Sequence, residues 1–374
     1  SYCALDVTNP DAPQYLWRID NTVTGFEELG QSWSEPAIGK VKVDDGMGGT
    51  EDKTVAVIGG GYSPDNSAGR ALYVIDILTG ALVKSFTVSD HANMTYSIPS
   101  APLAVDTTFD GYINRVYVGD LGGQMWRFGF QRADDDDFGV ESGNVDYWTP
   151  RLLFTTNTGS PIFYSPDLVL ERGYAYIYLG TGDRTSPCTT TGTNRMFAVK
   201  DRNENDAAFA SRVGAEGKLI EDDLVDLTDN LIQDGTEQQA ADTYALLDTK
   251  DGWYITMERT GEKILAAPVV IFGWVFFSTF VPNIDPCSYG GDAYLYAVNY
   301  LSGVSVLNFD ETNEGLHKTD RSLNIGHGIP TEAVVTINAE GEVVVYVGAG
   351  GGIFRLELPD VNTNFNIESW RELF

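Results

Sequence analysis

A short unit recurs along this chain and limits it to one kind of architecture. Each copy has an apolar strand, usually ending in glycine, and then a strand in which aromatic and aliphatic residues alternate. Strand repeats of about 40 to 50 residues are typical of propeller blades. Five copies follow one another, with first strands at Val55–Gly59, Val116–Gly119, Ala175–Gly180, Val275–Thr279 and Val343–Gly348.

A further apolar strand, begun by proline, usually precedes each copy. Proline lacks an N–H group, so at the start of a strand it removes no ladder hydrogen bond, which suits the innermost strand of a blade. A two-sheet sandwich would not need the same strand order in every unit, and the 3.6-residue period of a helical solenoid is scarce. The sequence therefore predicts an all-β propeller. The prolines are Pro36, Pro102, Pro166, Pro268 and Pro330.

We expect residues 1–374 to form a single propeller domain, the C-terminal part of a longer protein. Ser1–Val7 reads as a strand already in progress, so the first blade or two would be completed by residues upstream. Ser369–Leu373 is predicted as the strand that closes the ring.

Two long insertions interrupt the repeats. Residues 132–147 form an acidic loop, and residues 202–235 contain the only helix-like text. Within the second insertion, helical turns are predicted at Ala207–Arg212 and Asp222–Leu231.

The charge of the chain excludes several partners. Fifty-four acidic residues against 24 basic ones give a formal charge of -30, which repels phosphate backbones and anionic lipid surfaces. No nucleic-acid partner is expected. The longest apolar candidate, Ala266–Phe280, is interrupted by Pro268 and Gly273, so no membrane span is predicted either.

The three cysteines cannot all pair within the chain. Cys188 and Cys287 each follow a proline in a polar loop after an apolar strand, and a loop-to-loop disulfide between them is predicted in an oxidising compartment. Cys3 lies in a strand pattern and is predicted to be a small buried residue.

One loop carries a candidate metal site. Gly111 stands at its position 6, where a sharp turn is needed, and the Tyr112 carbonyl at position 7 is a further oxygen ligand, as in an EF-hand-like Ca²⁺ loop. Oxygen-bearing side chains stand at positions 1, 3, 5 and 9, which are Asp106, Thr108, Asp110 and Asn114.

A metal-free interpretation of the same loop stays open on spacing alone. Asp-Gly is a common turn dipeptide, so residues 106–114 could be a polar hairpin loop between two strands. Only Asp106 and Asp110 are charged, and Tyr117 replaces the bidentate Glu at position 12. A calcium site with this ligand set would have low affinity.

Motifs of common enzyme classes are missing from the sequence. It contains no GxSxG elbow, no Walker loop and no GxGxxG before a helix. His91, His317 and His327 lack the spacing of a zinc site. No particular carboxylate pair suggests a glycosidase. The chain is predicted to be a binding module and not an enzyme.

Seven ordered segments carry a resemblance to a known family. The segments are Tyr2–Thr8, Val57–Tyr62, Val118–Phe128, Leu179–Arg184, Gly261–Leu265, Phe276–Phe280 with Asp285–Cys287, and Ser369–Glu372. Together they run nearly from end to end, and with them the chain resembles the C-terminal domain of the PilY family of type IV pilus biogenesis proteins.

The resemblance implies a modified, quinoprotein-like propeller with seven blades when complete. It implies a secreted protein that passes through the periplasm or outer membrane to the cell surface or pilus tip. There the family's proteins promote pilus extension by opposing retraction and take part in adhesion. The implied partners are minor pilins of the tip complex, the upstream region of the same precursor, and surface or host ligands.

The resemblance also implies a single calcium site at the loop described above. Asp106, Asp110 and the Tyr112 carbonyl match the family's ligands, whereas Thr108 and Asn114 stand where Asn or Asp is more usual. Occupancy would decide whether retraction is blocked. Two other functions are compatible with the repeats: a dehydrogenase with a pyrroloquinoline quinone cofactor, and a propeller that binds or hydrolyses carbohydrate.

Overall fold

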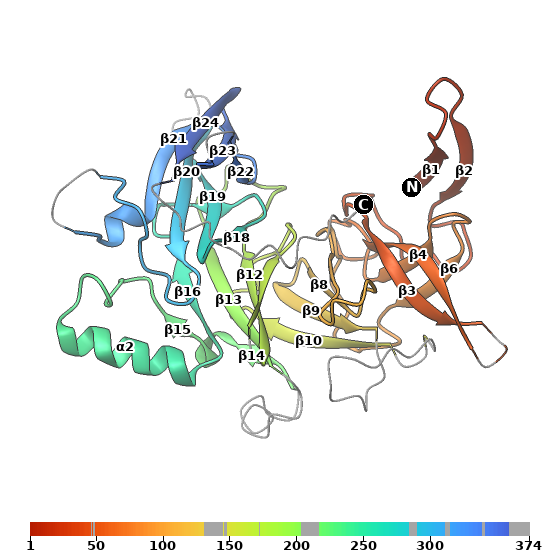
Figure 1. The fold of residues 1–374 in the computed structure, drawn as a ribbon, viewed down its shortest axis with the longest axis horizontal. Helices are drawn as coiled ribbons and strands as arrows, with labels where there is room; N and C mark the ends of the chain where they lie inside the picture. The colour runs from red at the N-terminus through yellow and green to blue at the C-terminus, as the bar shows by residue number, and fades with distance from the viewer. Residues whose placement is uncertain are drawn as a thin grey trace. The chain divides into compact units, whose positions relative to one another are not determined.

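The computed structural model shows an almost entirely β protein (Figure 1). It groups into two compact units, residues 1–166 with 202–219, and residues 167–201 with 220–374. The one α-helix in the described part is α2 (Glu237–Thr249). No described helix is long and apolar enough to span a membrane. The structure describes residues 1–45, 47, 49–130, 145, 148–171, 173–202, 217–283, 290–310, 315–338 and 341–358.

Sheets built mostly from consecutive, antiparallel strands form the first unit. A hairpin of β1 (Tyr2–Asp6) and β2 (Gln14–Ile19) precedes two larger sheets. One holds, in order, β3 (Ala37–Asp44), β4 (Thr50–Gly59), β5 (Leu72–Asp76) and β6 (Leu82–Phe86). The other holds, in order, β7 (Leu103–Val105), β8 (Arg115–Gly119), β9 (Gln124–Gly129), β10 (Thr149–Thr155) and β14 (Leu219–Ile220).

The second unit repeats this plan in three sheets. The first holds β11 (Asp167–Glu171), β12 (Tyr174–Gly180), β13 (Arg195–Arg202), β16 (Gly252–Thr256) and β15 (Val225–Asp226), which is parallel to β16. The next holds β17 (Lys263–Ile264), β18 (Val269–Ile271), β19 (Trp274–Pro282), β20 (Gly291–Asn299) and β21 (Ser322–His327). The last holds β22 (Val334–Ile337), β23 (Val343–Ala349) and β24 (Gly352–Glu357).

The predicted strands and the order of the repeats are confirmed. In all five copies the two predicted strands are neighbours in one sheet, and β4 with β5 and β8 with β9, for example, are antiparallel. The proline-led strands are also present, since β3, β7, β11 and β18 each begin at the residue after a proline. Strands β5 and β12 are buried along almost their whole length and read as continuous apolar runs.

Each unit has apolar cores of its own. In the first unit all five residues of β8 are buried, and Val57, Val118, Trp126 and Phe128 share one cluster. In the second unit Tyr178, Trp253, Phe277 and Val298 belong to another cluster. The aromatic residues that alternate in the sequence repeats thus form the centre of each core.

Glycine at the strand ends is required by close backbone contact. After β4, Gly61 has a φ of +91°, and its N–H bonds to the Ile98 carbonyl at 2.9 Å. A Cβ at Gly61 would overlap the Gln31 carbonyl. A Cβ at Gly59, the last residue of β4, would likewise overlap the Ile98 carbonyl, so a larger residue at either position would separate these loops.

The helix prediction was wrong in position. Asp222–Leu231 holds the end of a 3-10 helix, η2 (Glu221–Asp223), and the short strand β15 instead of an α-helix. The α-helix lies further along as α2, packed beside β15 (Figure 1). Thr236 and Gln239 cap its N-terminus reciprocally, a signal that sequence analysis could have used.

Several predictions fall outside the described residues. They are the helical turn at Ala207–Arg212, the closing strand at Ser369–Leu373 and nearly all of the acidic loop 132–147. The prediction that Cys3 is buried was wrong: Cys3 is exposed on β1 opposite Arg18, while its neighbours Tyr2 and Ala4 are half-buried.

A buried carboxyl group organises the turn between β8 and β9. Asp120 is fully buried, and its Oδ1 accepts hydrogen bonds from the backbone N–H groups of Gly122 (2.9 Å) and Gln124 (3.0 Å). Its Oδ2 accepts from Trp126 Nε1 at 2.8 Å. Burial outweighs these bonds and raises the pKa of Asp120 to about 7.

Asp120 therefore predicts a specific pH dependence of stability. The unfolded carboxyl titrates near 3.8 and the folded one near 7, so between these values the folded state binds more protons and stability falls as the pH rises. Asp120→Asn removes this titration and leaves Trp126 Nε1 facing an amide NH₂, at a cost of about 1 to 3 kcal/mol. The difference in thermal unfolding midpoint between the native protein and the variant should shrink as the pH rises from 4 to 7. Parallel pH profiles would contradict this assignment.

Candidate functional site

The candidate metal loop connects two adjacent strands of the first unit. Residues 106–114 lie between β7 and β8, which form an antiparallel pair, as the sequence predicted. Gly111 has a φ of +96°, in the region that glycine favours. Phe109, with a φ of +60°, is held in the same region, so the loop makes two left-handed turns.

The carboxylate of Asp106 is the centre of the loop. Its Oδ1 accepts hydrogen bonds from the N–H and hydroxyl of Thr108, both at 3.1 Å, and from the Asp110 N–H at 3.3 Å. Its Oδ2 accepts from the Gly111 N–H at 2.6 Å. The backbone from 108 to 111 therefore wraps around one carboxylate.

Asp110 lies on the exposed side of the loop. Its Oδ1 accepts a hydrogen bond from the Tyr112 N–H at 3.0 Å, which fixes the turn at Gly111. The loop thus brings both of its charged side chains and the residue that supplies the predicted carbonyl ligand into one turn.

Asn114 has a supporting contact that the sequence did not reveal. Its side chain is only 2% exposed, and its Oδ1 accepts hydrogen bonds from the N–H (3.0 Å) and hydroxyl (2.9 Å) of Thr107. Its Nδ2 donates to the Thr108 hydroxyl at 3.1 Å. As a ligand, Asn114 would have to exchange its bonds with Thr107 for a bond to the ion.

The donor set of the loop fits a hard cation. Its carboxylates, hydroxyl and backbone carbonyl are all oxygens, the ligand type that Ca²⁺ prefers. In the described ranges, no group of three or more His, Cys, Asp or Glu side chains could hold a metal ion. Any ion in this loop would therefore depend on two carboxylates plus neutral oxygens.

The predicted disulfide falls partly outside the described residues. Cys188 is exposed, and Cys287 is not among the described residues. The Cys188–Cys287 pairing stays a prediction.

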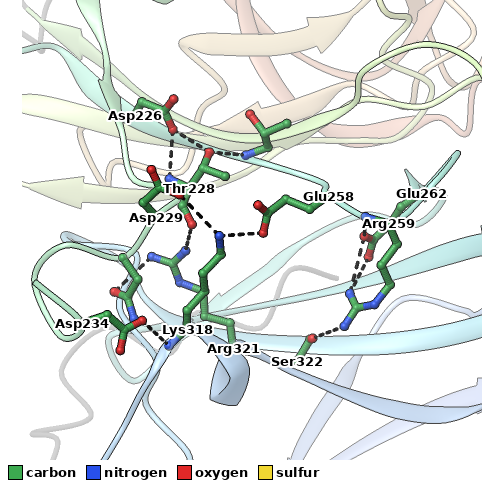
Figure 2. Close-up of polar contacts among 12 residues, drawn as sticks. Asp226, Thr228, Asp229, Asp234, Glu258, Arg259, Glu262, Lys318, Arg321 and Ser322 are labelled. Atoms are coloured by element: carbon green, nitrogen blue, oxygen red, sulfur yellow. Dashed lines mark hydrogen bonds and ion pairs between the residues drawn. The ribbon is translucent and has the colours of Figure 1, made fainter.

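Charged side chains in the second unit form a separate network, beginning at Glu262 (Figure 2). The Glu262 side chain is completely buried, and Arg259 Nη1 lies 3.2 Å from its Oε1. The same Oε1 accepts hydrogen bonds from Thr279 Oγ1 at 2.6 Å and from the Tyr296 hydroxyl at 2.8 Å. Arg259 also donates to Ser322 Oγ at 2.9 Å, so the network joins β19, β20 and β21.

The other half of Figure 2 surrounds η3 (Lys318–Arg321). Lys318 Nζ lies 2.7 Å from Glu258 and 3.6 Å from Asp229, and the backbone N–H of Lys318 donates to Asp234 Oδ2 at 2.9 Å. Arg321 is 3% exposed and donates to the Thr228 carbonyl at 3.1 Å. Burial lowers the pKa of Arg321 to about 10.

This network holds distant segments of the chain together. Arg321 and Thr228 are 93 residues apart in sequence, and Lys318 and Asp234 are 84 apart. Sequence analysis missed it because no local spacing marks partners so far apart. We interpret the network as structural, because its ion pairs and buried hydrogen bonds join segments that are far apart in the chain.

Fold and loop together define a β-propeller with one candidate cation site. The family model described as "PilY1 beta-propeller domain" matches residues 2–234 of this chain. The chain therefore belongs to the PilY1 β-propeller family.

A solved structure supports the same assignment of fold. The crystal structure of the Pseudomonas aeruginosa PilY1 C-terminal domain is similar with a TM-score of 0.65 and 21% sequence identity. The similarity covers 96% of this chain and 78% of that one. The predicted propeller fold is thereby confirmed.

Curated relatives carry the same family name. A type IV pilus biogenesis factor PilY1 homolog of Xylella fastidiosa is 26% identical over 338 residues, covering 82% of this chain and 21% of the relative. Type IV pilus biogenesis factor PilY1 of Pseudomonas aeruginosa PAO1 is 26% identical over 363 residues, covering 86% of this chain and 30% of the relative. The chain thus spans less than a third of the length of either relative.

The buried network predicts unequal effects of two matched substitutions. Glu262→Gln removes the charge beside Arg259 and weakens bonds from Thr279 and Tyr296, so it should destabilise the fold by about 1 to 3 kcal/mol. Glu258→Gln removes only an exposed pair with Lys318 and should cost less than about 1 kcal/mol. Thermal unfolding midpoints measure both. Equal shifts in the two variants would argue against a structural role for Glu262.

Proposed function

We propose that this chain is the calcium-responsive propeller of a type IV pilus biogenesis factor, which promotes pilus extension by opposing retraction. Family membership and the names of the relatives support the pilus role. The observation that carries the calcium role is the loop in which Asp106 accepts four hydrogen bonds from residues 108 to 111. The loop backbone is thus folded around the carboxylate that we propose as the first ligand.

In this proposal the ion is held by Asp106, Asp110, the Tyr112 carbonyl and the neutral oxygens of Thr108 and Asn114. Bound Ca²⁺ would supply a charge that draws these oxygens together. Asp106 keeps the loop wrapped, and Asn114 supports it from beneath through Thr107 and Thr108. Order in this hairpin would then depend on calcium concentration.

The remaining parts of the proposal concern the whole protein. The chain would act at the cell surface or pilus tip, in contact with minor pilins, and would contribute to adhesion to surface or host ligands. It would do so by binding and not by catalysis. The charge of -30 suits a role away from nucleic acid and anionic lipid.

Asp110→Ala tests the calcium loop directly. It removes one of two charged ligands while leaving the Asp106 wrapping in place, so calcium affinity should fall about tenfold or more. Isothermal titration calorimetry on the purified chain measures this. Asp6→Ala is a matched control, because Asp6 is also exposed and accepts one backbone N–H, from Thr8. Unchanged calcium affinity in Asp110→Ala would refute the loop assignment.

The cellular part of the proposal has its own measurement. Cells that carry Asp110→Ala in the full protein should show fewer surface pili and less twitching motility than cells with Asp6→Ala. If the variant loses calcium binding but pilus number and motility stay native, the ion has no part in controlling retraction.

A further inference from the structure

The candidate calcium loop also contacts a neighbouring sheet of the first unit. The Tyr112 hydroxyl donates a hydrogen bond to Asp52 Oδ2 on β4 at 2.9 Å. Lys42 Nζ on β3 lies 4.2 Å from the centroid of the Tyr112 ring. Lys42 and Asp52 face each other as register partners in the β3–β4 pair. One tyrosine of the loop is therefore held between two opposite charges of another blade.

The next residue adds a backbone and a packing contact. The Ile113 N–H donates to the Lys40 carbonyl on β3 at 2.8 Å. A Cβ at Gly39 would come within 2.5 Å of Ile113 Cδ1, so the isoleucine side chain lies directly against the β3 backbone. Residues 112 and 113 thus contact β3–β4 through two hydrogen bonds, one cation–π contact and apolar packing.

We propose that Asp52 is a positioning residue of the calcium site, acting through Tyr112. The inference rests on the proposed function, because it concerns the same ion. Tyr112 would supply its backbone carbonyl to the ion and its side chain to Asp52, so the side-chain contact sets where the carbonyl lies. The β3–β4 pair would therefore hold the loop in its ion-binding shape.

Linkage makes this coupling reciprocal. If the Tyr112–Asp52 contact strengthens calcium binding, calcium must strengthen the contact by the same factor. Ion binding between β7 and β8 would then rigidify β3–β4, although neither of those strands supplies a ligand. Calcium binding would therefore change the rigidity of two blades, the one that contains the loop and the one that contains β3–β4.

The test is a double-mutant cycle on calcium affinity. Tyr112→Phe removes only the hydroxyl and keeps the backbone carbonyl, and Asp52→Asn removes the charge that accepts from it. Each should weaken calcium binding about three- to tenfold, the range expected for one partly exposed hydrogen bond to a charge. The double variant should be no weaker than the weaker single variant. Calorimetric titration of the purified chain with calcium measures all four proteins.

Glu51→Gln controls for the loss of one negative charge. Glu51 precedes Asp52 on β4 but pairs with Lys53 at 2.9 Å. The calcium affinity of Glu51→Gln should stay within about twofold of the native affinity, as expected for a surface charge that pairs outside the loop. If Glu51→Gln weakens binding as much as Asp52→Asn, the effect is general electrostatics and the positioning role is overturned.

Hydrogen exchange gives a second readout. Calcium should slow amide exchange in β3 and β4 of the native chain, and Tyr112→Phe should abolish that slowing. If the native chain binds calcium but both single variants keep native affinity, or their effects simply add, the coupling is overturned and the calcium site stands. If the native chain does not bind calcium, the proposed site fails, and this inference fails with it.

Discussion

Sheets buried on both faces are the constraint on which the rest of this structure depends. All five residues of strands such as β8 are buried, so these strands are stable only when neighbouring sheets cover them. Such sheets leave polar chemistry to the loops. Close contacts also form just after the strand ends. Gly61 lies against the backbone of Gln31, and the Asp120 carboxyl accepts a hydrogen bond from the Gln124 N–H within its turn.

The candidate calcium loop shows how this architecture can produce a switch. It lies between two antiparallel strands, and it is wrapped around Asp106 by its own backbone. With only two charged ligands, calcium binding at the proposed site would be weak. Contacts of Tyr112 with β3–β4 would carry that response into another sheet.

Much of the fold was predictable from the sequence, because paired apolar strands leave a local pattern. The strands and their pairing followed from the repeats, and the loop at residues 106–114 followed from its spacing. Other features leave no such pattern. Arg321 and Thr228 form a hydrogen bond although they are 93 residues apart. The hydrogen bond from Thr107 to Asn114 depends on the conformation of the hairpin, which the spacing of the residues does not determine. The helix α2 was missed because only Thr243 and Leu247 are buried, so it lacks a clear apolar face.

The central claim is that the loop between β7 and β8 holds one calcium ion. Crystals of the chain grown in saturating calcium test it most directly, through anomalous diffraction. The account predicts one peak in this loop, with Asp106, Asp110 and the Tyr112 carbonyl at about 2.3 to 2.6 Å. A well-ordered loop with no peak at saturating calcium, or an ion bound only elsewhere in the chain, would contradict it.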